Sequence, residues 1–142
     1  SSIASIAVAA HECGHAIQDK VGYKLLRFRH SIIPTVNICS KLGYIVVVIG
    51  LLFGSFNLAM IGLFLLCTIL VFQLVTLPVE FNASHRAREE LIKLNLADKG
   101  DDSGIKSMLF AAAMTYVASV ASTLLQMLRM LLIILNSRRS DD

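Results

Sequence analysis

The sequence predicts an all-α integral membrane protein. Its 142 residues are 56% hydrophobic and only 16% charged, with a mean hydropathy of +0.70, which lies outside the composition of ordinary soluble domains. Residues 42–79 include no charged side chain, and this run is roughly twice the ~20 residues that one helical crossing of a bilayer needs. A further apolar segment starts at residue 107. Together these segments favour a helical protein that crosses the membrane several times.

The long apolar run is expected to form a transmembrane hairpin. Gly54, Ser55 and Asn57 interrupt it with small and polar residues, which favours a turn near residues 54–57. The two spans then cover about residues 39–53 and 58–77. A buried helical hairpin of a soluble protein is the alternative structure for the same pattern.

A third span is expected over residues 107–136, after the polar stretch 96–106, which is typical of a loop. We therefore treat residues 1–142 as a single membrane domain in four parts. These are a first helix with a basic interfacial segment (1–37), the transmembrane hairpin (38–77), a surface helix with its following loop (78–104) and a last transmembrane helix (105–136). The chain begins with serine and has no signal-peptide pattern, so we expect further sequence to precede it.

Basic residues flank the expected hairpin, whereas its turn has none. Those on the two flanks are Lys20, Lys24, Arg27, Arg29 and Lys41, then Arg86, Arg88, Lys93 and Lys99. By the positive-inside rule both flanks lie in the cytoplasm, in a multi-pass protein of the plasma membrane. Interfacial anchoring, with no information on orientation, is the alternative. No nucleic-acid-binding pattern accompanies these residues, so the expected partner is the lipid bilayer and not a nucleic acid.

The stretch AAHECGHAIQ, residues 9–18, places two histidines one helical turn apart. On a helix His11 and His15 share one face, as two imidazole ligands of one Zn²⁺ ion must. Glu12 is offset by about 100° around the helix, so it can reach a water on the metal and act as a general base. Gly14 carries a mild helix cost but leaves room beside the metal. The motif therefore predicts a zinc site.

Two alternatives to a zinc site stay open. The histidines and the glutamate can form a satisfied polar network on an apolar helix. They can also form half of a carboxylate di-iron site, but that site needs a second Glu-x-x-His pair, which the sequence lacks.

Two histidines leave zinc short of a protein ligand, and Glu80 is the candidate for the third. It is the first charge after the expected hairpin, which returns the chain to the membrane face where the two histidines lie. Pro78 is expected to kink the helix at the membrane exit and to aim Glu80 away from lipid. An ordinary interfacial glutamate is the alternative.

Two separated segments carry a family resemblance. They are AVAAHECGHAIQDKVGY at residues 7–23 and VTLPVEFNASHRAREE at residues 75–90. In this order they closely resemble the bacterial neutral zinc metallopeptidase family of membrane proteins, often called YugP-like. By broader analogy the chain is similar to gluzincins, such as the HtpX-type heat-shock protease and the CAAX prenyl endopeptidase.

The resemblance implies one Zn²⁺ ion held by His11, His15 and Glu80, with Glu12 as the catalytic base. Many gluzincins have an aspartate four residues after the ligand glutamate, which orients the first histidine. Here that position is Ser84, a neutral side chain that can still accept a hydrogen bond from an imidazole N–H.

The expected function is that of a membrane-embedded zinc metalloendopeptidase with its site on the cytoplasmic face. It would hydrolyse peptide bonds of membrane or membrane-associated polypeptides, with Glu12 activating a zinc-bound water. One alternative is a site-2-type intramembrane metalloprotease, which takes its third ligand from an aspartate inside a later span. The second alternative is a non-catalytic membrane scaffold that retains a structural metal site. The sequence does not indicate an oligomeric state.

The remaining polar residues near the candidate ligand are expected to lie at the surface. His85 does not share the helical face of that ligand, and an interfacial histidine is favoured over a transition-state donor. Arg86 and Arg88 are expected to pair with Glu89 and Glu90. The three cysteines have no paired spacing and are expected to be free thiols.

Overall fold

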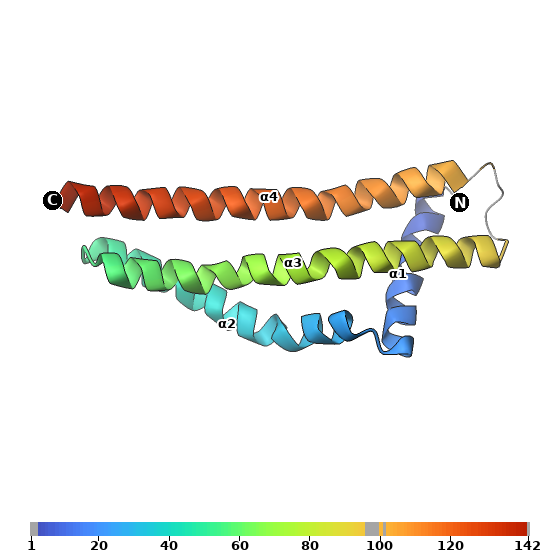
Figure 1. Cartoon of the computed structure of the whole chain (residues 1–142), viewed down its shortest axis with the longest axis horizontal. Coiled ribbons are helices and arrows are strands. Elements are labelled where there is room, and N and C mark those ends of the chain that lie inside the picture. The colour runs from blue at the N-terminus through green and yellow to red at the C-terminus, as the bar shows by residue number, and fades with distance from the viewer. Residues whose placement is uncertain (1–2, 96–99, 101, 142) are drawn as a thin grey trace. The chain divides into compact units, whose positions relative to one another are not determined.

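The computed structural model describes residues 3–95, 100 and 102–141, and it confirms the all-α fold. Four helices follow one another, and no strand occurs in the described ranges. Their bounds are Ile3–Val21 (α1), Lys24–Leu52 (α2), Phe56–Lys93 (α3) and Asp102–Asp141 (α4) (Figure 1). By length and composition, α2, α3 and α4 are each able to cross a membrane.

A glycine in the left-handed conformation ends α1. Gly22 has a φ of 72°, which a residue with a Cβ adopts only with strain. Its N–H donates to the Asp19 carbonyl (3.1 Å), and the Tyr23 N–H donates to the Gln18 carbonyl (2.8 Å). This hydrogen-bond pair satisfies the last carbonyls of the helix and turns the chain into α2 within two residues.

A glycine in the left-handed conformation also ends α2, at the turn into α3. Gly54 has a φ of 67°, and the Ser55 N–H donates to the Gly50 carbonyl (2.8 Å). The Ser55 hydroxyl then caps α3 by accepting the N–H of Leu58 (3.3 Å). The break expected near residues 54–57 is therefore confirmed as a tight turn.

The chain divides into two compact units, which we describe separately. The first comprises Ser1–His30 with Val75–Ala118, and the second comprises Ser31–Leu74 with Ser119–Asp142. Helices α2, α3 and α4 each contribute to both units.

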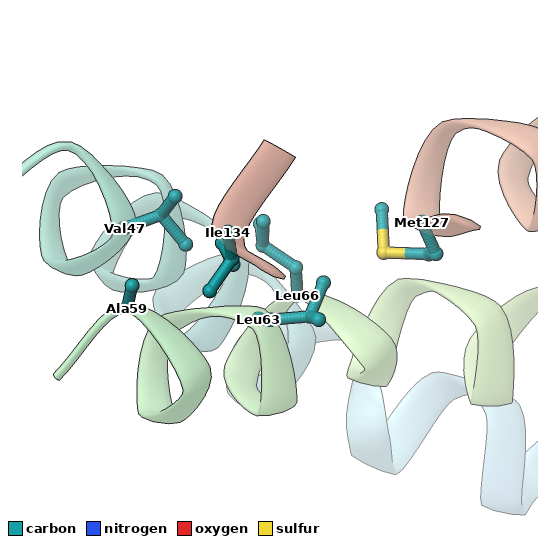
Figure 2. Close-up of a cluster of buried hydrophobic side chains, with 6 residues drawn as sticks. All are labelled: Val47, Ala59, Leu63, Leu66, Met127 and Ile134. Atoms are coloured by element: carbon teal, nitrogen blue, oxygen red, sulfur yellow. The ribbon is translucent and has the colours of Figure 1, made fainter. Parts of the chain in front are cut away.

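The second unit has a small apolar core within a largely apolar exterior. The buried core side chains come from α2 (Val47), α3 (Ala59, Leu63 and Leu66) and α4 (Met127 and Ile134), as Figure 2 shows. In the three candidate spans only 11–22% of the most apolar window is buried inside the protein. Long helices that leave this much apolar surface uncovered fit contact with lipid.

Close packing joins α2 to α3 in this unit at Gly50. A Cβ at this position would lie 2.8 Å from the Cα and 3.0 Å from the Cβ of Ala59. Small residues let membrane helices approach in this way, which increases van der Waals contact along the hairpin.

In the first unit, α1 lies directly against α3. The buried face of α1 consists of Ala7, Ala10, Gly14 and Gln18, spaced three and four residues apart. A Cβ at Gly14 would overlap the carbonyl oxygen of Ala83 and would lie 2.9 Å from its carbonyl carbon. The space that Gly14 leaves is therefore taken by the backbone of α3.

Apolar side chains from three helices complete the core of the first unit. They are Ala10 from α1, Ala87 and Leu91 from α3, and Ile105 and Leu109 from α4. This core places α1, the end of α3 and the start of α4 around the same centre.

The structure extends two of the expected elements. The segment expected as a surface helix continues the second span as part of one helix, α3, which runs through Pro78 to Lys93. Proline removes one helical hydrogen bond, but Val79 and Ala83, one and five residues after it, are fully buried, and their packing holds the helix together. Of the predicted loop 96–106, residues 102–106 belong to α4, whereas residues 96–99 and 101 lie outside the described residues.

Gly14→Ala is expected to destabilise the first unit by about 1–3 kcal/mol or to displace α1, because the added methyl group cannot share the space of the Ala83 carbonyl. Thermal unfolding in detergent and proteolytic release of α1 measure the effect. Gly100→Ala is the control, because a Cβ there meets nothing within 4 Å. Wild-type stability in Gly14→Ala would contradict the packing.

Gly50→Ala is expected to destabilise the α2–α3 hairpin by a similar amount, because the new Cβ collides with Ala59. Unfolding in a denaturing detergent, followed by circular dichroism, measures the change. Gly104→Ala is the matched helical control, since its Cβ makes only an ordinary 3.4 Å contact with Ile3 and alanine favours a helix. Equal responses of the two variants would rule out the close contact as the cause.

Candidate metal centre

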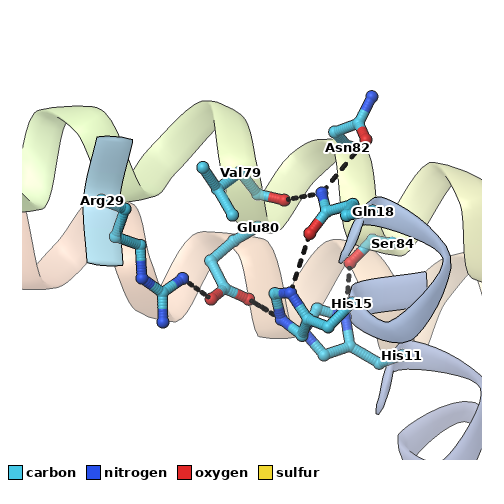
Figure 3. Close-up of polar contacts among 8 residues, drawn as sticks. All are labelled: His11, His15, Gln18, Arg29, Val79, Glu80, Asn82 and Ser84. Atoms are coloured by element: carbon cyan, nitrogen blue, oxygen red, sulfur yellow. Dashed lines mark hydrogen bonds and ion pairs between the residues drawn. The ribbon is translucent and has the colours of Figure 1, made fainter. Parts of the chain in front are cut away.

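The structure brings the three predicted ligands together in the first unit. His11 and His15 project from one face of α1, and Glu80 projects from α3 (Figure 3). His11 Nε2 lies 2.8 Å from Glu80 Oε2, His15 Nε2 lies 3.2 Å from the same oxygen, and the two Nε2 atoms lie 3.1 Å apart. Three atoms able to bind a metal therefore face one small volume.

The spacing of these atoms fits a tetrahedral zinc site. Ligand bonds of about 2.0–2.1 Å at the tetrahedral angle place neighbouring ligand atoms about 3.3 Å apart. The three separations of 2.8–3.2 Å are close to that value. Two imidazole nitrogens and one carboxylate oxygen are also the donor set of many catalytic zinc sites, which keep a fourth position for water.

Neighbouring side chains hold both imidazole rings in this orientation. Nδ1 of His11 lies 3.1 Å from the hydroxyl oxygen of Ser84, and Nδ1 of His15 lies 2.9 Å from Oε1 of Gln18. Ser84, at the position where many gluzincins have an aspartate, therefore does contact the first histidine. Hydrogen bonds of this kind at the far nitrogen fix the rings that bind zinc through the other nitrogen.

The second carboxylate oxygen of Glu80, Oε1, is bound by Arg29. Its side chain is only 5% exposed, and Arg29 Nη1 donates to Oε1 at 2.9 Å. The carboxylate also interacts with Tyr116 of α4. Because Arg29 occupies Oε1, Oε2 alone faces the two histidines, and Glu80 is positioned to bind a metal through one oxygen.

Sequence reasoning missed three residues of this site, namely Gln18, Arg29 and Tyr116. Gln18 lies three residues after His15 on the buried face of α1, and a glutamine at that spacing was the available signal. Arg29 is one of several basic residues near the expected membrane face, and nothing in their order distinguishes it. Tyr116 lies far along the chain, on α4.

Glu12 and His85 are both exposed. Glu12 directly follows His11 on α1, in the position expected of a general base. His85 pairs with Glu89 at 3.1 Å, one turn along α3, and its side chain is 68% exposed. This geometry agrees with an ordinary surface histidine.

The arginine pairs expected from the sequence are wrong. Arg88 binds Asp102 at the start of α4 through two hydrogen bonds of 3.1 and 3.0 Å. Arg86 donates from Nε to Asn82 Oδ1 at 2.7 Å, one turn earlier on α3. The packing of α4 on α3 supplies a carboxylate that local spacing could not identify.

Comparison with known proteins supports these observations. A family model described as "Putative neutral zinc metallopeptidase" matches residues 1–135. The chain is 42% identical over 137 residues to "Putative membrane protease YugP" of Bacillus subtilis (strain 168), an alignment that covers 96% of the chain. It spans 61% of the length of that relative. No solved structure matches the chain.

The relative is named as a membrane protease, and three helices here are able to cross a membrane, which together indicate a multi-pass membrane protein. The family match extends over nearly all of the chain and includes both segments that contribute to the candidate metal centre. The chain therefore belongs to the family described as "Putative neutral zinc metallopeptidase".

Proposed function

We propose that this protein is a zinc-dependent endopeptidase of the gluzincin type, with its site at the membrane surface. The observation that carries the proposal is the convergence of His11 Nε2, His15 Nε2 and Glu80 Oε2. The family match supports zinc as the metal and peptide hydrolysis as the reaction class.

The electrostatics around His15 favour a cation at this point. Nδ1 of His15 faces the oxygen of Gln18, so in a neutral ring the proton lies on Nδ1 and Nε2 carries a lone pair. An ionised Glu80 likewise offers only lone pairs, and its Oε2 lies 3.2 Å from His15 Nε2. Nε2 of His15 and Oε2 of Glu80 would repel each other at this distance unless a proton or a metal ion lay between them.

In the proposed mechanism the residues of the site have separate roles. Zinc held by His11, His15 and Glu80 would supply a Lewis acid for the scissile carbonyl. Glu12 is exposed and follows His11 on α1, about 100° around the helix, which supports its proposed role of taking a proton from the attacking water and passing it to the leaving amine. Arg29 and Gln18 keep the ligand side chains in place during this exchange.

The proposed substrates are membrane or membrane-associated polypeptides, because Glu80 and its partner Arg29 belong to α3 and α2, which are both candidate membrane spans. The distribution of basic residues favours the cytoplasmic face. A site-2-type arrangement is not favoured, because the residue that joins the two histidines is a glutamate and not an aspartate.

Glu12→Gln is expected to lower kcat by about 10²–10⁴-fold with zinc content unchanged, because the amide cannot accept the proton of the water. Cleavage of a membrane-tethered polypeptide by the full-length protein, together with metal analysis, measures both quantities. Asp19→Asn, an exposed acidic position on the same helix, is the control. Unchanged cleavage in Glu12→Gln would contradict the mechanism, and zinc without cleavage in the wild type would favour a scaffold.

Glu80→Gln is expected to weaken zinc binding by at least about a hundredfold, since loss of a ligand costs more than the 10–100-fold typical of residues that only support ligands. Equilibrium competition with a chromogenic chelator measures the affinity. Glu89→Gln removes an exposed carboxylate of the same helix and serves as the control. Equal zinc affinity in the two variants would refute Glu80 as the third ligand. Thermal unfolding of the metal-free proteins shows whether the folded state survives the loss of the Arg29 partner.

A further inference from the structure

A chain of hydrogen bonds runs from the surface of α3 to the metal centre. Arg86 Nε donates to Asn82 Oδ1 (2.7 Å), and Gln18 Nε2 donates to the same oxygen (3.0 Å). Gln18 Nε2 also donates to the Val79 carbonyl (2.8 Å), and Gln18 Oε1 faces His15 Nδ1 (2.9 Å). Figure 3 shows Gln18 between α3 and His15, and its side chain is fully buried.

The chemistry of each group determines which atom donates and which accepts along this series of hydrogen bonds. Arginine is only a donor, so the atom of Asn82 that it contacts must be the amide oxygen. A backbone carbonyl is only an acceptor, so the Gln18 atom that faces Val79 must be the amide nitrogen. With its nitrogen bound to two acceptors, Gln18 can offer only its oxygen to His15.

When its ring is neutral, His15 must therefore donate from Nδ1, and Nε2 then carries no proton. The corresponding contact of His11 does not have this property, because the Ser84 hydroxyl can donate or accept. Of the two histidines, only His15 has its tautomer determined by groups whose own direction is fixed.

We propose that Gln18 is a positioning residue of the metal site, which holds His15 in the tautomer that binds zinc through Nε2. Asn82 and Arg86 fix the orientation of the Gln18 amide and act through it. This inference rests on the proposed zinc site for its functional meaning, whereas the tautomer itself is a property of the metal-free protein.

The first experiment measures that tautomer directly. In metal-free protein labelled with ¹⁵N-histidine, protonated and unprotonated ring nitrogens give separate NMR signals, and the His15 signals are those absent from His15→Gln. In its neutral form, His15 of the wild type is expected to show a protonated Nδ1 and an unprotonated Nε2. A neutral wild-type His15 with its single ring proton on Nε2 would overturn the proposal without any variant.

Two substitutions then separate positioning from simple helix packing. Gln18→Met removes both the acceptor for His15 and the donors to α3, so we expect mixed tautomers and about 10–100-fold weaker zinc binding. Gln18→Glu keeps an acceptor for His15 but loses the donors to Val79 and Asn82. It is expected to retain the wild-type tautomer and to lose much less zinc affinity. If Gln18→Glu behaves like Gln18→Met in both measurements, Gln18 only joins the two helices and the proposal fails.

Gln126→Met is the matched control, because Gln126 is exposed and its one described side-chain contact is a 3.5 Å hydrogen bond to Ser122. It is expected to match the wild type in both measurements. Absence of zinc binding in the wild type would refute the proposed function, and the NMR result would still decide the role of Gln18. The two proposals therefore fail in distinguishable ways.

Discussion

The contact between Gly14 and the backbone of Ala83 is the constraint on which the candidate metal centre depends. The two histidines belong to α1 and the carboxylate belongs to α3, so the distance between the helices sets the distances between ligand atoms. A Cβ at Gly14 would overlap the Ala83 carbonyl oxygen, and the helices would have to separate. Metal–ligand bond lengths stay within about 0.2 Å of their usual values, so such a separation would leave the three ligand atoms too far apart to bind one ion.

Glu80 can be buried because polar side chains surround its carboxylate: Arg29 donates a hydrogen bond to one oxygen, and His11 and His15 lie at the other. An unpaired carboxylate in so apolar an environment would carry a large desolvation cost. Arg29 offsets that cost at Oε1, and the histidine rings lie at Oε2. Because Arg29 occupies Oε1, only Oε2 is left for a metal. The ion pair that makes the burial of Glu80 possible therefore also favours metal binding through one oxygen.

A satisfied polar network and a metal site are not exclusive descriptions of these residues. The outer contacts, through Gln18, Ser84 and Arg29, are hydrogen bonds that are complete without an ion. The inner atoms are different, because Nε2 of His15 and Oε2 of Glu80 lie 3.2 Å apart and both carry lone pairs when the ring is neutral. Complete outer contacts and an electron-rich centre are the combination that preorganises a site for a cation.

Sequence alone determined the helical class, the apolar segments and the identities of His11, His15 and Glu80 as candidates, because periodicity and residue chemistry are local properties. It also placed the turn after α2, since small residues mark it directly. Only the tertiary structure decided that α3 continues through Pro78, that Arg88 pairs with Asp102, and that Gln18 and Arg29 orient the ligands. Those outcomes depend on which helix faces pack together. Helices α1 and α3 can approach closely only because Gly14 has no side chain.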